Sequence, residues 1–116
     1  MTIQRIESGT RMSKAVVHGD TVYLAGQVST NAAQGGVTEQ TKDILAIIDG
    51  FLAQAGTDKT KLLSANIWLT DIGTFAEMNA VWDAWLAPGC APARATVEAK
   101  LAAPNLKVEI AVIAAK

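Results

Sequence analysis

The chain has 116 residues, of which 50% are hydrophobic and 18% are charged, and its formal net charge is -1 at pH 7. This length suits one domain with a hydrophobic core, so we expect a single domain over residues 1–116. The balanced charge, without a run of Lys or Arg, argues against a protein that binds nucleic acid mainly through its charge. No apolar stretch approaches the roughly 20 residues of a membrane helix, and the N-terminal residues lack an apolar signal core. We therefore expect a cytoplasmic protein with no membrane partner.

Three short β-like stretches open the chain, at residues 3–8, 15–18 and 21–25. The second and third are separated only by Gly19-Asp20, which predicts a hairpin. Residues 29–37 are rich in turn-forming residues and are predicted to be a loop.

Two amphipathic helices follow. The first begins after Thr38, a candidate cap, and ends at Gly56; its apolar residues recur at helical spacing at Ile44, Leu45, Ile47, Ile48, Phe51, Leu52 and Ala55. Gly50 inside it costs roughly 1 kcal/mol relative to alanine, and close packing against a sheet is one explanation for it. The second helix begins at a predicted capping box of Thr74 and Glu77. It ends at Pro88-Gly89, with the stripe Phe75, Met78, Val81, Trp82, Trp85 and Leu86.

Three more stretches alternate between apolar and other residues, at 62–69, 94–101 and 107–112. Alternation of this kind predicts half-buried strands. The resulting element order predicts an α+β fold: one mixed sheet of about six strands with both helices on one face. The last two strands are expected to form a hairpin with its loop near residues 102–105. The other sheet face would be half apolar, which suggests self-association.

Arg94 and Glu109, on the last two predicted strands, are the strongest candidates for chemistry. An arginine fork matches a carboxylate with two parallel hydrogen bonds, and a glutamate can take a proton from water. Both could also be ordinary charges on a solvated sheet face. His18 and Cys90 are each the only residue of their type. No cluster has metal-ligand spacing, so we expect no metal and no cofactor.

Several segments together identify a family: GDTVYLAGQVS at 19–29, Gln40-Thr41, LLSANIWLTDIGTFAEMNAVWDAW at 62–85, PAR at 92–94 followed by TVE, and KVEIAVIAA at 107–115. With these segments the chain resembles, nearly end to end, the RidA/YjgF family of reactive-intermediate deaminases, formerly labelled endoribonuclease L-PSP. The resemblance implies a chorismate-mutase-like fold and a homotrimer with ligand clefts between subunits. It also implies hydrolysis of 2-imino or 2-enamino acids, such as 2-iminobutanoate and 2-iminopropanoate, to 2-oxo acids and ammonia.

The resemblance also assigns roles to residues. Arg94 would hold the substrate carboxylate, Glu109 would orient the attacking water, and Asn79 would lie near the cleft. The backbone of Gly26 and Thr96 would help to bind the ligand. Two positions depart from the family pattern, because Met12 stands where a tyrosine is frequent and Ala25 where a serine is frequent.

Two further readings stay open beside the deaminase. These departures at Met12 and Ala25 motivate a module that binds small carboxylates without turnover, and a chaperone-like role is also compatible with the sequence. A role in RNA cleavage is disfavoured by the acidic balance and the absence of a basic stripe. In a simple terminal hairpin, residue 94 would lie across from about residue 113, roughly 13 Å from Glu109 along the sheet. We therefore expect the arginine and glutamate that meet one ligand to come from different chains, or the hairpin register to be shifted.

Overall fold

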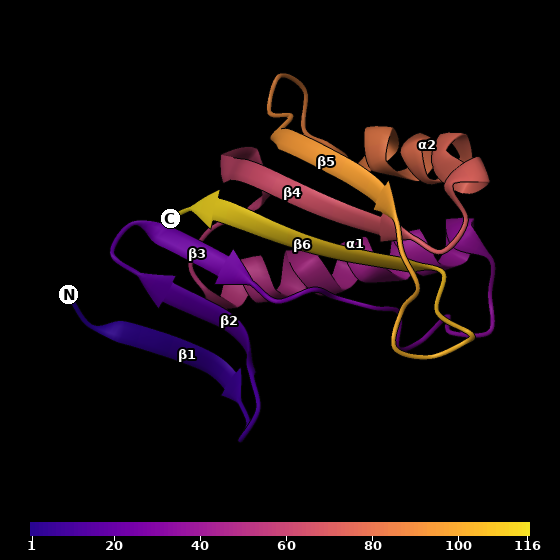
Figure 1. Cartoon of the computed structure of the whole chain (residues 1–116). Coiled ribbons are helices and arrows are strands. Elements are labelled where there is room, and N and C mark those ends of the chain that lie inside the picture. Colours follow the sequence, from indigo (N-terminus) through magenta and orange to yellow (C-terminus); the bar gives the residue numbers. More distant parts are fainter.

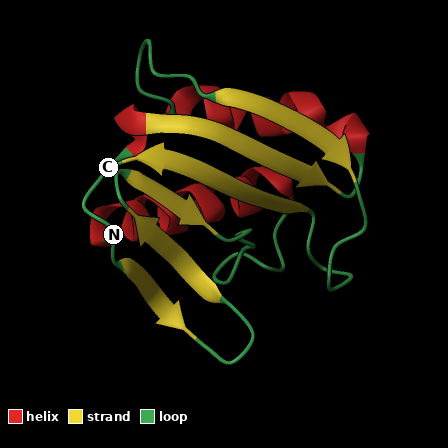
Figure 2. Ribbon diagram, turned by 60° about the vertical axis from the view of Figure 1, so that its left-hand side comes forward, coloured by secondary structure: helices red, strands yellow, loops and turns green.

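Six strands form one mixed sheet in a computed structural model that describes residues 1–116 (Figure 1). In chain order they are β1 (Ile3–Ser8), β2 (Ser13–His18), β3 (Thr21–Leu24), β4 (Leu62–Leu69), β5 (Ala93–Glu98) and β6 (Val108–Ala115). Two α-helices, α1 (Val37–Gln54) and α2 (Phe75–Trp85), lie on the same face of the sheet (Figure 2). Short 3-10 turns precede β4 at Lys59–Lys61 and α2 at Ile72–Thr74. The predicted α+β arrangement is confirmed.

The strands lie in the order β1-β2-β3-β6-β4-β5. The N-terminal strands form an antiparallel meander, and the predicted hairpin closes with His18 paired to Thr21. Gly19 in its turn has a φ of +60°, a backbone conformation that glycine adopts without steric cost. β6 then pairs antiparallel with both β3 and β4, and β5 pairs parallel with β4 at the edge.

The predicted hairpin between the last two strands is wrong, because β4 lies between β5 and β6. Helix α2 is the crossover that brings β5 parallel to β4, as a strand-helix-strand unit requires. β5 ends at Glu98, and residues 99–107 then carry the chain past the end of β4 so that β6 can enter between β3 and β4 (Figure 1). Alternation showed that both segments are strands, but it contained no information on which neighbour each would choose.

The core lies between the helices and the sheet face that they cover. Every second residue of β6 is buried, while the residues between them are half-buried on the open face. The buried residues of β6 pack with those of β4 and of both helices. The largest fully buried side chains among them are Ile44, Leu45, Ile48, Leu52, Ile67, Leu69, Met78, Val108, Ile110 and Val112. The predicted apolar stripe of α1 therefore faces the sheet, although Ile47 and Phe51 are only half-buried.

The predicted N-cap of α1 is wrong, whereas Thr74 is the N-cap of α2 as predicted but makes no capping hydrogen bond through its side chain. The cap of α1 is Gly36, whose N–H donates to the Glu39 carboxylate at 3.1 Å, and Thr38 lies inside the first turn. The Thr38 N–H donates to Glu77 Oε2 at 3.2 Å. Glu77 therefore joins the N-terminal ends of the two helices, and the predicted capping box of Thr74 with Glu77 does not form.

Gly50 lies inside helix α1, and Gly56 lies two residues after its end. Gly56, with a φ of +84°, follows the last turn as predicted. Gly50 is exposed, and a Cβ built on it would meet nothing within 4 Å. Close packing against the sheet therefore does not explain this glycine.

The sheet face opposite the helices is uncovered (Figure 2). It carries the exposed side chains of Tyr23 and Val97, which are 45% and 49% accessible. Half-buried Trp68 and Ile113 lie on the same face. A half-apolar open face of this kind is compatible with the predicted self-association, which stays a prediction for this chain.

Candidate functional site

Arg94 is held in place by helix α2 on the covered face of the sheet. It pairs in register with buried Ala65 of β4, so its side chain leaves edge strand β5 on the same side as the helices. Its Nη1 donates to Asn79 Oδ1 at 2.8 Å. The Arg94 Cζ lies 5.7 Å from the ring centre of Phe75 and 5.5 Å from that of Trp82. The guanidinium is thus oriented by one hydrogen bond and two aromatic rings.

No carboxylate of the chain pairs with this half-buried guanidinium. An arginine has five N–H donors, and the single hydrogen bond to Asn79 leaves most of them available. A planar, pre-oriented fork of this kind fits a carboxylate or another oxyanion that arrives from outside. The geometry therefore supports anion binding at the sheet edge.

Phe75 and Trp82 were predicted to lie in the apolar stripe of the second helix. Phe75, Asn79 and Trp82 follow each other at i, i+4 and i+7, so they share one side of α2, and that side faces Arg94. The helical spacing was visible in the sequence. Their contact with Arg94 on strand β5 was not visible there.

Thr96 lies two residues beyond Arg94 on the same face of β5. Its register partner is buried Ile67. The Thr96 hydroxyl is buried and has no hydrogen-bond partner in the structure. A buried hydroxyl without a partner costs free energy unless a further group satisfies it. Arg94 is hydrogen-bonded to Asn79, and Thr96 lies two residues along the same strand face, so the three are treated as one polar group.

Glu109 lies on the opposite, open face of the sheet. Its neighbours Val108 and Ile110 are fully buried against the helices, so the glutamate side chain points the other way. Its carboxylate lies over the backbone of Gly26: a Cβ built on Gly26 would stand only 2.1 Å from Glu109 Oε2. A glycine is thus required at residue 26 for this placement, and Gly26 and Glu109 form a second polar group.

The two groups do not meet within one chain. Arg94 aligns with Ala65 and through it with Val112, three residues from Glu109 on a strand two positions away. The separation is roughly 10 Å in each direction along the sheet, and the side chains lie on opposite faces. The predicted separation thus holds for a different reason, because the terminal hairpin on which it was first based does not exist.

Ala25 and Met12, the two departures expected from the resemblance, lie in different places: Ala25 adjoins the second group, and Met12 lies apart from both groups. Ala25 precedes Gly26, and its N–H donates to the Lys14 carbonyl at 3.0 Å. Its own carbonyl accepts a hydrogen bond from the Gln27 side chain at 3.0 Å. Met12 lies in the turn between β1 and β2 and is 47% exposed. The structure does not bring Met12 to the Arg94 group of its own chain.

Gln40 connects the loops at the far end of the sheet. It is fully buried, its Nε2 donates to the carbonyls of Gly35 and Asn105, and its Oε1 accepts from the Lys107 N–H at 2.9 Å. These bonds hold the loop before α1 against the loop that leads into β6, and the two lie side by side in Figure 1. Gln40 thereby fixes the start of the strand that carries Glu109.

Asp43 stabilises the same loop from its other side. Its Oδ2 accepts from the Ser29 hydroxyl at 2.7 Å and from the N–H groups of Thr30 and Asn31, each at 2.9 Å. The hydrogen bond from Ser29, reinforced by these backbone bonds, lowers the pKa of the Asp43 carboxyl below its ordinary value of 3.8. The loop is therefore tied to an ionised carboxylate at neutral pH.

No group of three or more His, Cys, Asp and Glu side chains is arranged to hold a metal ion. No helix has both the length and the apolar character needed to cross a membrane.

The fold and the two polar groups define a small α+β protein with one mixed sheet, covered on one face by two helices, and a free arginine at the sheet edge. Comparison with known proteins gives the family. The family model described as Endoribonuclease L-PSP matches residues 2–116. The chain belongs to this family, which also includes the RutC and YjgF proteins.

Individual relatives agree in both sequence and fold. A RutC family protein of Haemophilus influenzae is 46% identical over 114 residues, covering 98% of each chain. The RutC family protein YoaB of Escherichia coli is 44% identical over 115 residues, covering 99% of each. The crystal structure of a YjgF family member from Neisseria meningitidis is 47% identical and superimposes with a TM-score of 0.95, covering 100% of this chain and 96% of that one. The resemblance seen in the sequence is thus confirmed for family and fold.

Proposed function

We propose that this protein hydrolyses 2-imino acids, and the 2-enamino acids from which they form, to 2-oxo acids and ammonia. Water adds to the electrophilic carbon of the protonated imine, and the resulting tetrahedral adduct loses ammonia as its C–N bond breaks. The carbon keeps the oxygen of the water, so the products are a 2-oxo acid and an ammonium ion. No oxidant, metal or cofactor is needed to balance this reaction.

The observation that carries the proposal is the guanidinium of Arg94, which bonds to Asn79 but pairs with no carboxylate of the chain. A 2-imino acid has a planar carboxylate directly bonded to its electrophilic carbon. A bidentate arginine that holds the carboxylate therefore also aims the reacting carbon. Asn79 and the rings of Phe75 and Trp82 fix the fork before the ligand arrives. Fixing it beforehand reduces the entropy lost on binding.

Glu109 is the proposed general base that orients the attacking water. Imines hydrolyse unaided in water, so positioning together with one general base, worth about a hundredfold to ten-thousandfold, suffices. The side chains of Arg94 and Glu109 leave opposite faces of one sheet. We therefore propose that each site forms in a homotrimer, between Arg94 of one subunit and Glu109 of its neighbour.

The reaction is tested by generating imino acids with an amino-acid oxidase and trapping them with semicarbazide. The wild-type protein should suppress the trapped product. Arg94→Ala should lose this suppression by at least about a hundredfold, whereas Arg5→Ala, at an exposed arginine of β1, should retain it. Suppression by Arg94→Ala at the wild-type rate would remove the carboxylate role. If the wild type suppresses no product from acidic, basic or apolar imino acids, the proposed enzymatic activity is refuted.

The shared site is tested by mixing two inactive variants. Arg94→Ala and Glu109→Ala are unfolded together in equal amounts and refolded, so that subunits associate at random. A site at a head-to-tail interface regains both groups in about one case in four, whatever the number of subunits in the ring. We expect about a quarter of wild-type activity from the mixture and none from either variant alone. A mixture as inactive as its components would place both groups in one chain.

A second candidate, a binding module without turnover, rests on two observed side chains. Met12 and Ala25 supply no hydroxyl where relatives of this family often carry one, so a water or ligand loses a partner there. The carboxylate receptor around Arg94 would remain. Calorimetric titration with 2-oxo acids distinguishes the candidates: binding that Arg94→Ala abolishes, in a protein with no imine hydrolysis, would favour the module.

A further inference from the structure

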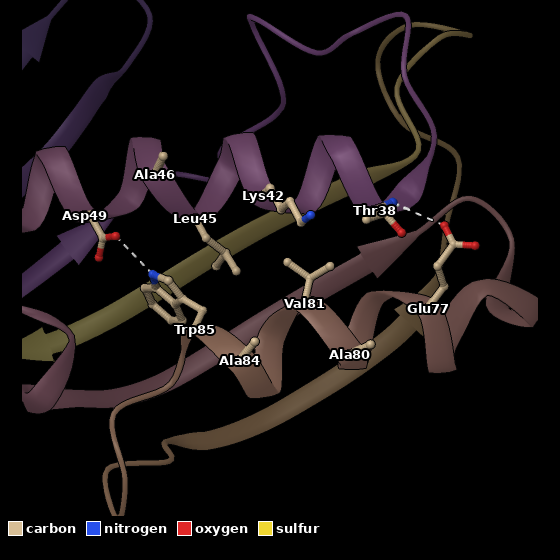
Figure 3. A pocket seen from close by; sticks show the side chains of 10 residues that line it. All are labelled: Thr38, Lys42, Leu45, Ala46, Asp49, Glu77, Ala80, Val81, Ala84 and Trp85. Carbon is tan, nitrogen blue, oxygen red and sulfur yellow. Dashed lines mark hydrogen bonds between the residues drawn. The ribbon is translucent and has the colours of Figure 1, made fainter.

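A groove runs between helices α1 and α2, on the covered side of the molecule and away from both polar groups (Figure 3). Its volume is about 600 Å³, and ten residues line it: Thr38, Lys42, Leu45, Ala46, Asp49, Glu77, Ala80, Val81, Ala84 and Trp85. Six of the ten are apolar. Neither the carboxylate receptor nor Glu109 contributes to it, so the proposed reaction leaves this groove unexplained.

The walls of the groove are two parallel helices. At one end the Thr38 N–H donates to Glu77 Oε2, and at the other Trp85 Nε1 donates to Asp49 Oδ2 at 3.1 Å. The lining residues recur at i, i+3, i+4, i+7 and i+8 on α2, which is the spacing of one helix ridge. From Thr38 to Asp49 the groove is roughly 16 Å long, about three helical turns.

The groove is an open trough rather than an enclosed pocket. Ala46, Ala80 and Ala84 are exposed at its sides, whereas Leu45 at its base is buried. A small-molecule site encloses most of its ligand's surface. This trough can cover only one side of an occupant, as a groove does for the apolar stripe of a helix. The three alanines allow the backbone of such a helix to approach closely.

The charged residues of the groove indicate which kind of helix it can bind. A carboxylate lies at each end, Glu77 at one and Asp49 at the other (Figure 3). Only one oxygen of each carboxylate has a hydrogen-bond partner. An incoming cation can therefore pair with the second oxygen at either end. The one cation of the lining, Lys42, lies between the two ends.

We propose that this groove binds an amphipathic helix of another protein, with an apolar stripe about three turns long and a lysine or arginine at each end of the stripe. The stripe covers Leu45, Val81 and the alanines, while the two basic residues pair with Glu77 and Asp49. The binding is independent of the proposed hydrolysis, because the groove shares no residue with either polar group.

The probe for the test is a fluorescein-labelled synthetic peptide of about 16 residues, with leucines at i, i+3, i+4 and i+7 and one lysine at each end of the stripe. Fluorescence anisotropy should report saturable binding to the wild type and none for a scrambled peptide of equal composition. Ala80→Glu, at the side of the groove, should weaken binding at least about tenfold, because a buried carboxylate is costly. Ala76→Glu, at an exposed α2 residue outside the groove, should bind as the wild type does.

The glutamate variants separate shape from charge. An extra carboxylate alone would strengthen the attraction of a basic peptide, so a loss in Ala80→Glu has to come from blocked packing and from burial of the new carboxylate. Ala46→Glu on the facing helix should reproduce it. Glu77→Gln and Asp49→Asn keep an acceptor for their present partners and remove the charge. Each should weaken binding by about threefold to fivefold at low salt, the size of an exposed ion pair.

Three outcomes would overturn the proposal. If the wild type does not bind the peptide, or if Ala80→Glu and Ala76→Glu bind it equally well, the groove is not a binding site for a helix. Saturable binding of an apolar dye that Ala80→Glu abolishes, without peptide binding, would assign the groove to small molecules. A change in subunit number on Ala80→Glu, measured by sedimentation, would assign it to a second copy of this chain.

Discussion

Replacing Gly26 by alanine should remove catalysis while leaving the fold intact. A Cβ at this residue would stand 2.1 Å from Glu109 Oε2, whereas ordinary contact begins near 3.4 Å. The carboxylate therefore has to retreat by about 1.3 Å or rotate away. It is the far end of a flexible side chain and Gly26 is half-buried, so the backbone can stay where it is.

The effect on activity follows from that displacement. A misplacement of about 1 Å costs roughly a hundredfold in a reaction that depends on positioning. A general base that is lost altogether costs up to about ten-thousandfold. We expect imine hydrolysis by Gly26→Ala to fall by a factor between these two, with the affinity for 2-oxo acids changed less than the rate.

Gly50→Ala is the matched control. Its new Cβ meets nothing within 4 Å, and the residue is exposed in the middle of α1. It should raise the free energy of unfolding by up to about 1 kcal/mol and leave the rate unchanged, when both variants are compared by urea unfolding at equal protein concentration. Wild-type activity in Gly26→Ala would refute the argument that Glu109 has to lie over residue 26.

Three other changes test the groups that support the site. Gln40→Leu should lower the free energy of unfolding by at least about 2 kcal/mol, because buried backbone groups of both loops lose their partners; a loss within the error of urea unfolding would contradict this. The hydrogen bond from Ser29 lowers the pKa of Asp43, so its stabilisation is fully present above the ordinary value of 3.8 and disappears as pH falls through the lowered pKa. Asp43→Asn should therefore reduce stability at pH 7 and flatten its decline below about pH 4, measured as the unfolding free energy across pH. Asn79→Asp places a carboxylate 2.8 Å from Nη1 of Arg94, where it competes with the ligand. It should raise the Kd for 2-oxo acids by about tenfold or more, and an unchanged Kd would show that the ligand binds elsewhere.

Much of the local structure could be predicted from the sequence. Strand Leu62–Leu69 has the predicted bounds, and from Ala65 to Leu69 its burial follows the predicted alternation, because alternation follows from the burial of one strand face. Leu63 departs from it and is 52% exposed, next to a register shift between Leu62 and Ser64. The Gly19-Asp20 turn was equally predictable, since its chemistry is local. Both helix stripes were predictable because a helix has to bury one side against the sheet.

The misses that bear on the site depend on partners that are distant in the sequence. Glu77 was assigned to cap its own helix, but its carboxylate accepts from Thr38, 39 residues earlier. The cap rule considers only neighbours along the chain, so it could not anticipate a second helix alongside. In the same way, Phe75 and Trp82 appeared to be core residues until the structure placed Arg94 against them.

The strand order has the largest consequence for function. A terminal hairpin would have made Arg94 and Glu109 neighbours in one sheet, separated only by register. Because β4 lies between their strands, Arg94 is presented at the sheet edge beside α2, while Glu109 stands near the middle of the open face. The residues of each polar group are thus assembled within one chain, but the two groups of that chain lie far apart. If imine hydrolysis needs both, the edge of one subunit has to meet the open face of the next. The uncovered apolar residues of that face would then be buried by the same contact that assembles the site.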